Sequence, residues 1–266
     1  TVLNDSNFTF INPNLANTAL ANQIFTSVSS LNPLAADGGQ DGDTTEELRL
    51  NAVGNFQNQL RTVTKEDYLI RALSMPSSLG TIAKAYASPT KIDGYNPGEL
   101  PTILDLFVLT YNSTGNLRTA SSLMKANLAT YLAEYRMIND SIKIKDAFII
   151  NIEVTFDIIV LPNYNNNKTI TDCITSLTSF FDVDKWQINQ PILLSDLFIL
   201  LDKVEGVQTV KNVTVNNLVG EALGYSDYAY DIAGATINQV VYPSIDPMIF
   251  EVKNPNTDIK GRVVPL

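Results

Sequence analysis

INIEVTFDIIV, residues 150–160, alternates apolar and polar side chains over most of its length. The even positions from Ile150 to Val160 are apolar, and the odd positions from Asn151 to Asp157 are polar. A period of two is typical of a β-strand that buries one face and exposes the other. Such a strand belongs to an antiparallel or mixed sheet with helices on one side, because a sheet covered on both faces has near-continuous apolar strands.

Helical and strand patterns lie on both sides of this strand, so we predict an α+β fold with helices packed on one face of an antiparallel or mixed sheet. The predicted helices span 44–58, 64–75, 117–138, 168–182 and 193–204. The predicted strands span 80–87, 104–112 and 208–215, followed by a β-rich segment with strands at 237–242, 248–253 and 259–264. We divide the chain into an N-terminal extension with an acidic Gly-rich loop (1–43), an α+β core (44–217) and a small β-rich C-terminal assembly arm (218–266).

The composition excludes several classes of enzyme. The 266 residues contain no histidine and a single cysteine, Cys173. Histidine-based triads, HExxH metal sites and cysteine zinc sites are therefore absent from this sequence. We expect Cys173 to be a buried, small apolar residue and the chain to use no cofactor.

The formal net charge is −10, from 18 basic and 28 acidic side chains. An acidic chain is repelled by phosphate groups, so we expect it to bind neither nucleic acid nor an anionic membrane. We find no apolar run of the length that a membrane span needs.

Two helix starts follow one another in the first third of the core. Thr44 with Glu47, and Thr64 with Asp67, each have the spacing of a capping box, in which the side chains of the N-cap and N3 residues accept each other's backbone N–H. A short extended link that includes Arg61 and Val63 separates the two predicted helices. The pattern predicts a rigid helix–elbow–helix unit.

The stretches Asp41–Arg49 and Phe56–Tyr68 together resemble the baseplate J-like family of phage tails, in particular the large baseplate wedge subunit of contractile-tailed phages. The shared features are an acidic Gly-rich loop, a helix opening on Thr-x-Glu-Glu-Leu-Arg, and Arg61-x-Val63-Thr64-x-x-Asp67-Tyr68. The resemblance covers about residues 36–75.

The resemblance implies a non-enzymatic structural protein of the virion, made in the host cytoplasm. Members of the family dimerise and form a ring around the tail hub, in contact with other wedge and hub proteins. They are usually longer than this chain, which begins with Thr1, so we expect a fragment or a reduced version of such a subunit.

Two groups of residues are candidates for structural or intersubunit contacts. In the elbow, the same side chains either hold the two helices together or touch a neighbouring subunit. The C-terminal tyrosines are interface candidates because tyrosine buries a large area and keeps one polar contact. The candidates are Thr44, Glu47, Arg61, Val63, Thr64, Asp67, Tyr68, Tyr225, Tyr228, Tyr230 and Tyr242.

Three other interpretations stay open at this point. Asp37, Asp41 and Asp43 either form an acidic turn or bind a cation, although their spacing does not match an EF-hand. Trp186 either packs inside the fold or forms a platform for a sugar, which makes a carbohydrate- or receptor-binding module the alternative function. A histidine-free hydrolase would need two facing carboxyl groups in a cleft, at least one of them with a raised pKa.

Overall fold

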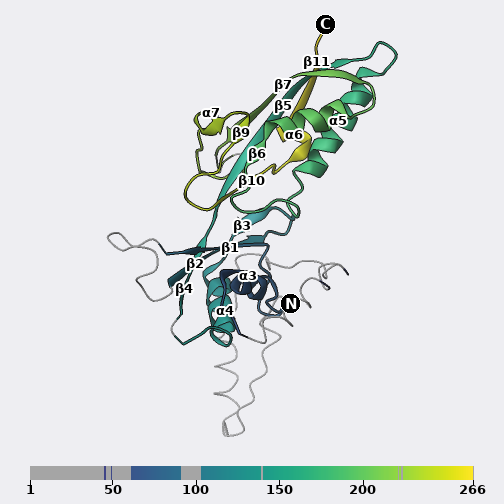
Figure 1. Cartoon of the computed structure of the whole chain (residues 1–266). Helices are drawn as coiled ribbons and strands as arrows, with labels where there is room; N and C mark the ends of the chain where they lie inside the picture. Colours follow the sequence, from purple (N-terminus) through teal and green to yellow (C-terminus); the bar gives the residue numbers. More distant parts are fainter. Residues whose placement is uncertain are drawn as a thin grey trace.

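The computed structural model shows an elongated molecule with a helix-covered sheet at each end (Figure 1). It describes Thr45, Arg49, Ala222 and residues 61–90, 103–138, 140–220 and 224–265. We call residues 61–146 the α3–α4 lobe and residues 148–265 the α5–α6 lobe. Strand β4 of the first lobe leads through a single residue, Ala147, into β5 of the second.

The α3–α4 lobe contains a four-stranded mixed sheet built around β2. Strand β1 pairs antiparallel along one edge of β2, and β4 (parallel) and β3 (antiparallel) share the other edge. The strands are β1 (Lys84–Pro89), β2 (Ile103–Tyr111), β3 (Leu117–Thr119) and β4 (Ser141–Asp146).

Two helices, α3 (Lys65–Leu73) and α4 (Ser122–Ala133), lie at one end of the molecule next to this sheet (Figure 1). Alternate residues of β2, from Leu104 to Val108, are buried in one core with side chains of both helices. The helical members of this core are Tyr68, Ala72, Met124, Leu128 and Leu132.

The α5–α6 lobe is organised around the 13-residue strand β5 (Phe148–Val160). Along one edge, β7 (Val207–Leu218) runs antiparallel to β5. Along the other edge, β10 (Met248–Glu251) pairs with the start of β5 and β11 (Ile259–Val263) with its end, both in parallel.

The predicted alternation of β5 is confirmed from Ile152 to Ile158, whereas Asn151, predicted on the exposed face, is 1% exposed. Ile152, Val154, Phe156 and Ile158 are buried, and the polar residues between them face the other side of the sheet. Helices α5 (Asn166–Phe180) and α6 (Leu194–Asp202) contribute Cys173, Leu177, Leu197 and Leu201 to the same core. Cys173 is fully buried, as expected from the sequence, and burial raises the pKa of its thiol to about 11.

A third, small sheet lies beside this core, with strand order β6–β9–β8. Its strands are β6 (Ile192–Leu193), β8 (Thr236–Ile237) and β9 (Val240–Val241), and the short helix α7 (Ile232–Ala235) leads into β8. One further helical turn, α8 (Pro255–Asp258), precedes β11.

The α+β class with mixed sheets and helices on one face is confirmed. The division of the chain at residues 43 and 217 stays a prediction. Within 218–266, however, β10 and β11 form one edge of the sheet around β5, so this segment takes part in the central sheet of its lobe.

The predicted helix over 117–138 is wrong at both ends. Leu117–Thr119 pairs with β2 as a strand, and the helix spans Ser122–Ala133. It starts there because the Ser121 side chain accepts the N–H of Met124 and caps the helix.

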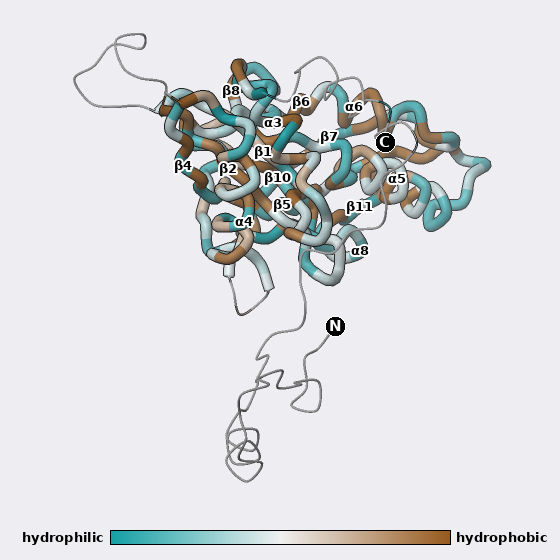
Figure 2. The backbone as a smooth tube through the Cα atoms, turned by 90° about the horizontal axis from the view of Figure 1, so that it is seen from below, coloured by the Kyte–Doolittle hydropathy of each residue, from teal (hydrophilic) through white to brown (hydrophobic). Residues whose placement is uncertain are grey.

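Within the described part of the chain, we find no helix with both the length and the apolar character needed to cross a membrane. Hydrophilic and hydrophobic residues instead follow one another at short intervals along the backbone (Figure 2).

Candidate functional site

The second predicted cap forms as expected. Thr64 is the N-cap of α3, its hydroxyl accepts the N–H of Asp67, and the Asp67 carboxylate accepts the N–H groups of Thr64 and Val63, each at 2.9 Å. Burial acts to raise the pKa of Asp67, but these backbone hydrogen bonds outweigh it and leave the pKa below its ordinary value. The start of α3 is therefore held by a charged carboxylate.

The link before α3 is fixed to the end of α4. The N–H and the hydroxyl of Thr62 both donate to the carbonyl of Tyr135, at 2.9 and 3.0 Å, and Thr62 is fully buried. Next to it, Arg61 and Val63 are exposed. The elbow therefore presents two side chains to solvent from a fixed backbone.

Tyr68 anchors the same region from inside. Its ring is buried and its hydroxyl donates to Asp140 at 2.7 Å. Burial raises the pKa of Tyr68 to about 12, so the hydroxyl keeps its proton at neutral pH. Thr44, Glu47 and the acidic residues Asp37, Asp41 and Asp43 lie outside the described residues.

The four C-terminal tyrosines differ in their contacts and in their exposure. Tyr225 donates its hydroxyl to Asp258, and Tyr230 donates to the carbonyl of Tyr242, both at 2.6 Å. Tyr228 packs edge-on against Phe148 and is about half exposed, as is Tyr242. Tyr228 and Tyr242 thus remain the better candidates for contact with a neighbour.

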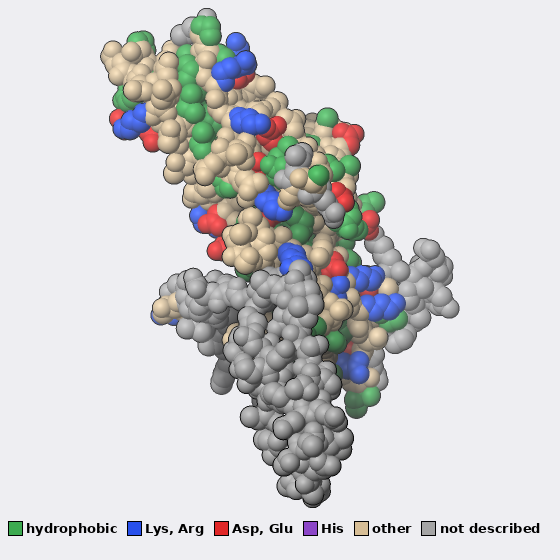
Figure 3. Space-filling view, turned by 180° about the vertical axis from the view of Figure 1, so that it is seen from behind, with side chains coloured by type: hydrophobic (Ala, Val, Ile, Leu, Met, Phe, Trp, Pro, Cys, Tyr) green, Lys and Arg blue, Asp and Glu red, His purple; other side chains and the backbone are tan. Residues whose placement is uncertain are grey.

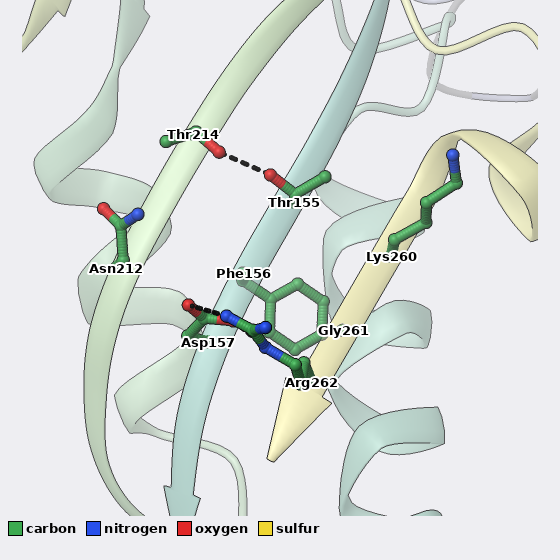
Figure 4. Close-up of a pocket in the computed structure, with 8 residues that line it drawn as sticks. All are labelled: Thr155, Phe156, Asp157, Asn212, Thr214, Lys260, Gly261 and Arg262. Atoms are coloured by element: carbon green, nitrogen blue, oxygen red, sulfur yellow. Dashed lines mark hydrogen bonds and ion pairs between the residues drawn. The ribbon is translucent and has the colours of Figure 1, made fainter. Parts of the chain in front are cut away.

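The outer face of the sheet in the α5–α6 lobe has a shallow hollow of about 290 Å³ (Figure 4). It crosses β7, β5 and β11, on the side away from the core. Its polar lining consists of Thr155, Asp157, Asn212, Thr214, Lys260 and Arg262.

The charges of this face are paired across the strands. Arg262 donates two hydrogen bonds of 3.0 Å to Asp157, and Lys260 forms an ion pair with Glu153. Thr155 and Thr214 share a hydrogen bond between their hydroxyl groups. The hydrogen bonds from Arg262 lower the pKa of Asp157, so this carboxyl group stays ionised.

This arrangement is suited to contact with another protein surface rather than to proton transfer. A general acid at neutral pH needs a raised pKa, and Asp157 has a lowered one. A shallow, open surface of paired charges and bonded hydroxyls can instead contact a polar protein surface. Seen from behind, basic and acidic side chains lie next to one another in several places on the molecule (Figure 3).

Sequence reasoning missed this face because its partners lie far apart in the chain. The alternation of β5 places Glu153, Thr155 and Asp157 on the exposed side. Their ion-pair partners Lys260 and Arg262 come more than a hundred residues later, and no local pattern connects them.

One alternative loses the feature that would have supported it, whereas the cation site at Asp37, Asp41 and Asp43 lies outside the described residues and stays a prediction. Trp186 is 4% exposed and packs against Phe180 and Phe181, so it does not provide a platform for a sugar. Among the residues that the structure describes, no group of acidic or cysteine side chains is arranged to hold a metal ion.

Comparison with known proteins shows a weak likeness to a solved structure. No family model matches the chain, and no curated protein matches it. Among solved structures, a chain of the cryo-EM structure of the anti-feeding prophage (AFP) baseplate, 6-fold symmetrised, matches with a TM-score of 0.48 and 12% identity.

The match covers 82% of this chain and 43% of that chain, so this protein spans less than half the length of its neighbour. At this identity and TM-score, the likeness supports no conclusion about the fold or the function of this chain.

Proposed function

We propose that this chain is a structural, non-enzymatic subunit of a contractile phage tail baseplate. In this role it forms part of the wedge ring around the tail hub, through homodimeric contacts and contacts with other wedge and hub proteins. Its location is the virion, after synthesis in the host cytoplasm.

The observation that carries the proposal is the motif between Asp41 and Tyr68, which resembles the baseplate J-like family. Its described part, from Arg61 to Tyr68, folds as a capped elbow. The capping box of Thr64 and Asp67 fixes one side of the elbow, and the hydrogen bonds of Thr62 to the end of α4 fix the other. A rigid support of this kind suits a subunit that neighbours must contact in a defined orientation.

The chemistry of the outer sheet face agrees with a role in assembly. Asp157 and Glu153 are neutralised by Arg262 and Lys260, and the open hollow is shallow. The absence of histidine from the sequence removes the most common general base of enzymes. The proposed function depends on surfaces that contact other subunits and does not need a catalytic site.

A gene deletion in the phage that encodes this chain, complemented in trans, tests the proposal. Without the chain we expect no complete contractile tails in negative-stain micrographs, and with the wild-type chain we expect tails that carry immunogold label at the baseplate end. Complete, infectious tails without the chain, or label absent from the particles, would contradict the proposal.

Sedimentation of the purified chain at micromolar concentration tests the homodimeric contact separately. A dimer or larger ring is expected. A chain that stays monomeric and also fails to enter particles would rule out the assembly role.

A further inference from the structure

We propose that the outer face of the small sheet β6–β9–β8 is a docking surface for a basic protein partner within the assembly. This inference rests on the proposed function and names the chemistry of one partner. It concerns a different surface from the elbow and from the polar face of the larger sheet.

The small sheet exposes a row of apolar side chains. Leu193 of β6 and Ile237 of β8 both pair with Val240 of β9, so the three side chains point to the same side. Leu193 is 41% exposed and Ile237 is 58% exposed. In the neighbouring row, Ile192 and Val241 are fully buried in the core of the lobe. The sheet is thus apolar on both sides, and among the described residues only the side of Ile192 and Val241 is covered by the core of the lobe.

Further apolar side chains follow directly along the chain. Tyr242, the residue after β9, is 48% exposed, and Ile245 on the loop toward β10 is 83% exposed. Large apolar side chains that are close together and exposed mark an interaction site more often than single ones do.

The backbone of the apolar row is held in place by a tight turn and by a hydrogen bond to α6 within this chain. Asn238 and Gln239 form the two-residue turn between β8 and β9, both with positive φ, at 52° and 63°. The carbonyl of Gln239 accepts the N–H of Leu194 at the start of α6. A surface held in this way loses little conformational entropy on binding.

The charged side chains within the segments that form the row are of one sign. The segments 186–202 and 212–252, which contain all three strands, include no Lys or Arg. They do include the exposed carboxylates Asp196, Asp231 and Asp246, which lie close in sequence to β6, β8 and β9. An apolar row with an acidic rim complements apolar side chains surrounded by Lys or Arg.

The same charges argue against a second copy of this chain as the occupant. A two-fold contact of this surface with itself would place the acidic rims of two copies against each other. A basic protein of the assembly is therefore the occupant that fits, and homodimeric contacts belong to other surfaces of the chain.

The test uses full-length chain supplied in trans to the deletion phage, with three variants at the rim and the row. Ile237→Lys adds a positive charge to the row, and Ile237→Glu adds a negative one at the same exposed position. Asp196→Asn and Asp246→Asn together remove rim charge. Circular dichroism and thermal unfolding identical to wild type confirm that each variant folds.

We expect Ile237→Lys to reduce the copies of the chain per particle about tenfold, because it repels a basic partner, and Ile237→Glu to reduce them less. Removal of the rim charges is expected to weaken incorporation, because it takes away part of the attraction to the partner. Incorporation of all variants at the wild-type level, or a stronger effect of Ile237→Glu than of Ile237→Lys, would overturn the inference.

Photo-crosslinking from position 237 in assembled particles identifies the partner. A crosslink to a different protein, in a peptide with Lys or Arg beside apolar residues, is expected. A crosslink to a second copy of this chain would overturn the inference and leave the proposed function intact. Wild-type chain that is absent from particles altogether would instead overturn the proposed function.

Discussion

The carboxylate of Glu251 accepts a hydrogen bond of 2.7 Å from the backbone N–H of Leu117, which lies 134 residues earlier in the chain. Glu251 ends β10 in the α5–α6 lobe, and Leu117 begins β3 in the α3–α4 lobe. The second carboxylate oxygen of Glu251 accepts the side-chain N–H of Asn151 at 2.8 Å, and Glu251 is 2% exposed. A buried carboxylate thus joins the two lobes.

Glu251→Ala is expected to destabilise the fold by about 2 kcal/mol or more, because it leaves the N–H of Leu117 and the amide of Asn151 buried without an acceptor. Urea unfolding monitored by Trp186 fluorescence measures the change. Glu66→Ala is a matched control, since Glu66 is exposed, and it should change little. If Glu251→Ala proved as stable as this control, the hydrogen bonds of Glu251 would contribute nothing to the free energy of unfolding.

The pH dependence of stability should carry a signature of Glu251. Burial raises its pKa above the ordinary 4.5, although its two hydrogen bonds act in the opposite direction. A raised native pKa means that the folded state binds more protons, so its contribution to stability is present below pH 4.5 and is lost as pH rises through the native pKa.

Glu251→Gln removes the titrating group and should remove the corresponding fall in stability. The difference in free energy of unfolding between wild type and Glu251→Gln, measured from about pH 3 to about pH 8, gives the test. A difference that is constant over this range would contradict the raised pKa.

Local patterns in the sequence predicted the features that depend on residues close together in the chain. The alternation of β5 from Ile152 to Ile158 and the capping box of Thr64 and Asp67 involve residues only a few positions apart, and both are confirmed. The N-terminal end of the predicted helix 117–138 was wrong because Leu117 continues the three- and four-residue spacing of α4, whereas its pairing with Tyr111 of β2 places it in a strand.

The long-range relationships had no local signal. The parallel pairing of β10 and β11 with β5, and the ion pair of Asp157 with Arg262, each join positions about a hundred residues apart. The apolar row of the small sheet likewise depends on the register of β6 with β9, which the sequence pattern does not specify.

Asp67→Asn tests the cap of α3. The amide loses the charge that favours the backbone hydrogen bonds of Thr64 and Val63 and the helix N-terminus, so we expect a loss of about 1 kcal/mol at neutral pH. The lowered pKa of Asp67 makes its contribution present above its ordinary value of 3.8 and lost as pH falls through the native pKa. The variant and wild type should therefore converge in stability in acid; Glu66→Gln, in the same helical turn, serves as the control.

Arg262→Ala should raise the pKa of Asp157 toward its ordinary value, because Arg262 supplies both hydrogen bonds that lower it. Carboxyl chemical shifts in an NMR titration follow this group directly. Lys260→Ala is the matched control on the same strand, since Lys260 pairs with Glu153 instead. If both variants leave the pKa of Asp157 unchanged, the pairing across the outer face is not formed in solution.

Gly261→Ala tests the packing of β11 on β5. Gly261 is opposite Phe156 in the parallel register, and a Cβ atom at this position would collide with the Cζ atom of the buried Phe156 ring. Overpacking of this kind is expected to cost about 1–3 kcal/mol, measured by urea unfolding. The smaller side chain of a Phe156→Leu background should reduce the cost of Gly261→Ala, because it removes the atoms in conflict. An equal cost in both backgrounds would place the strain elsewhere than in the contact between Gly261 and Phe156.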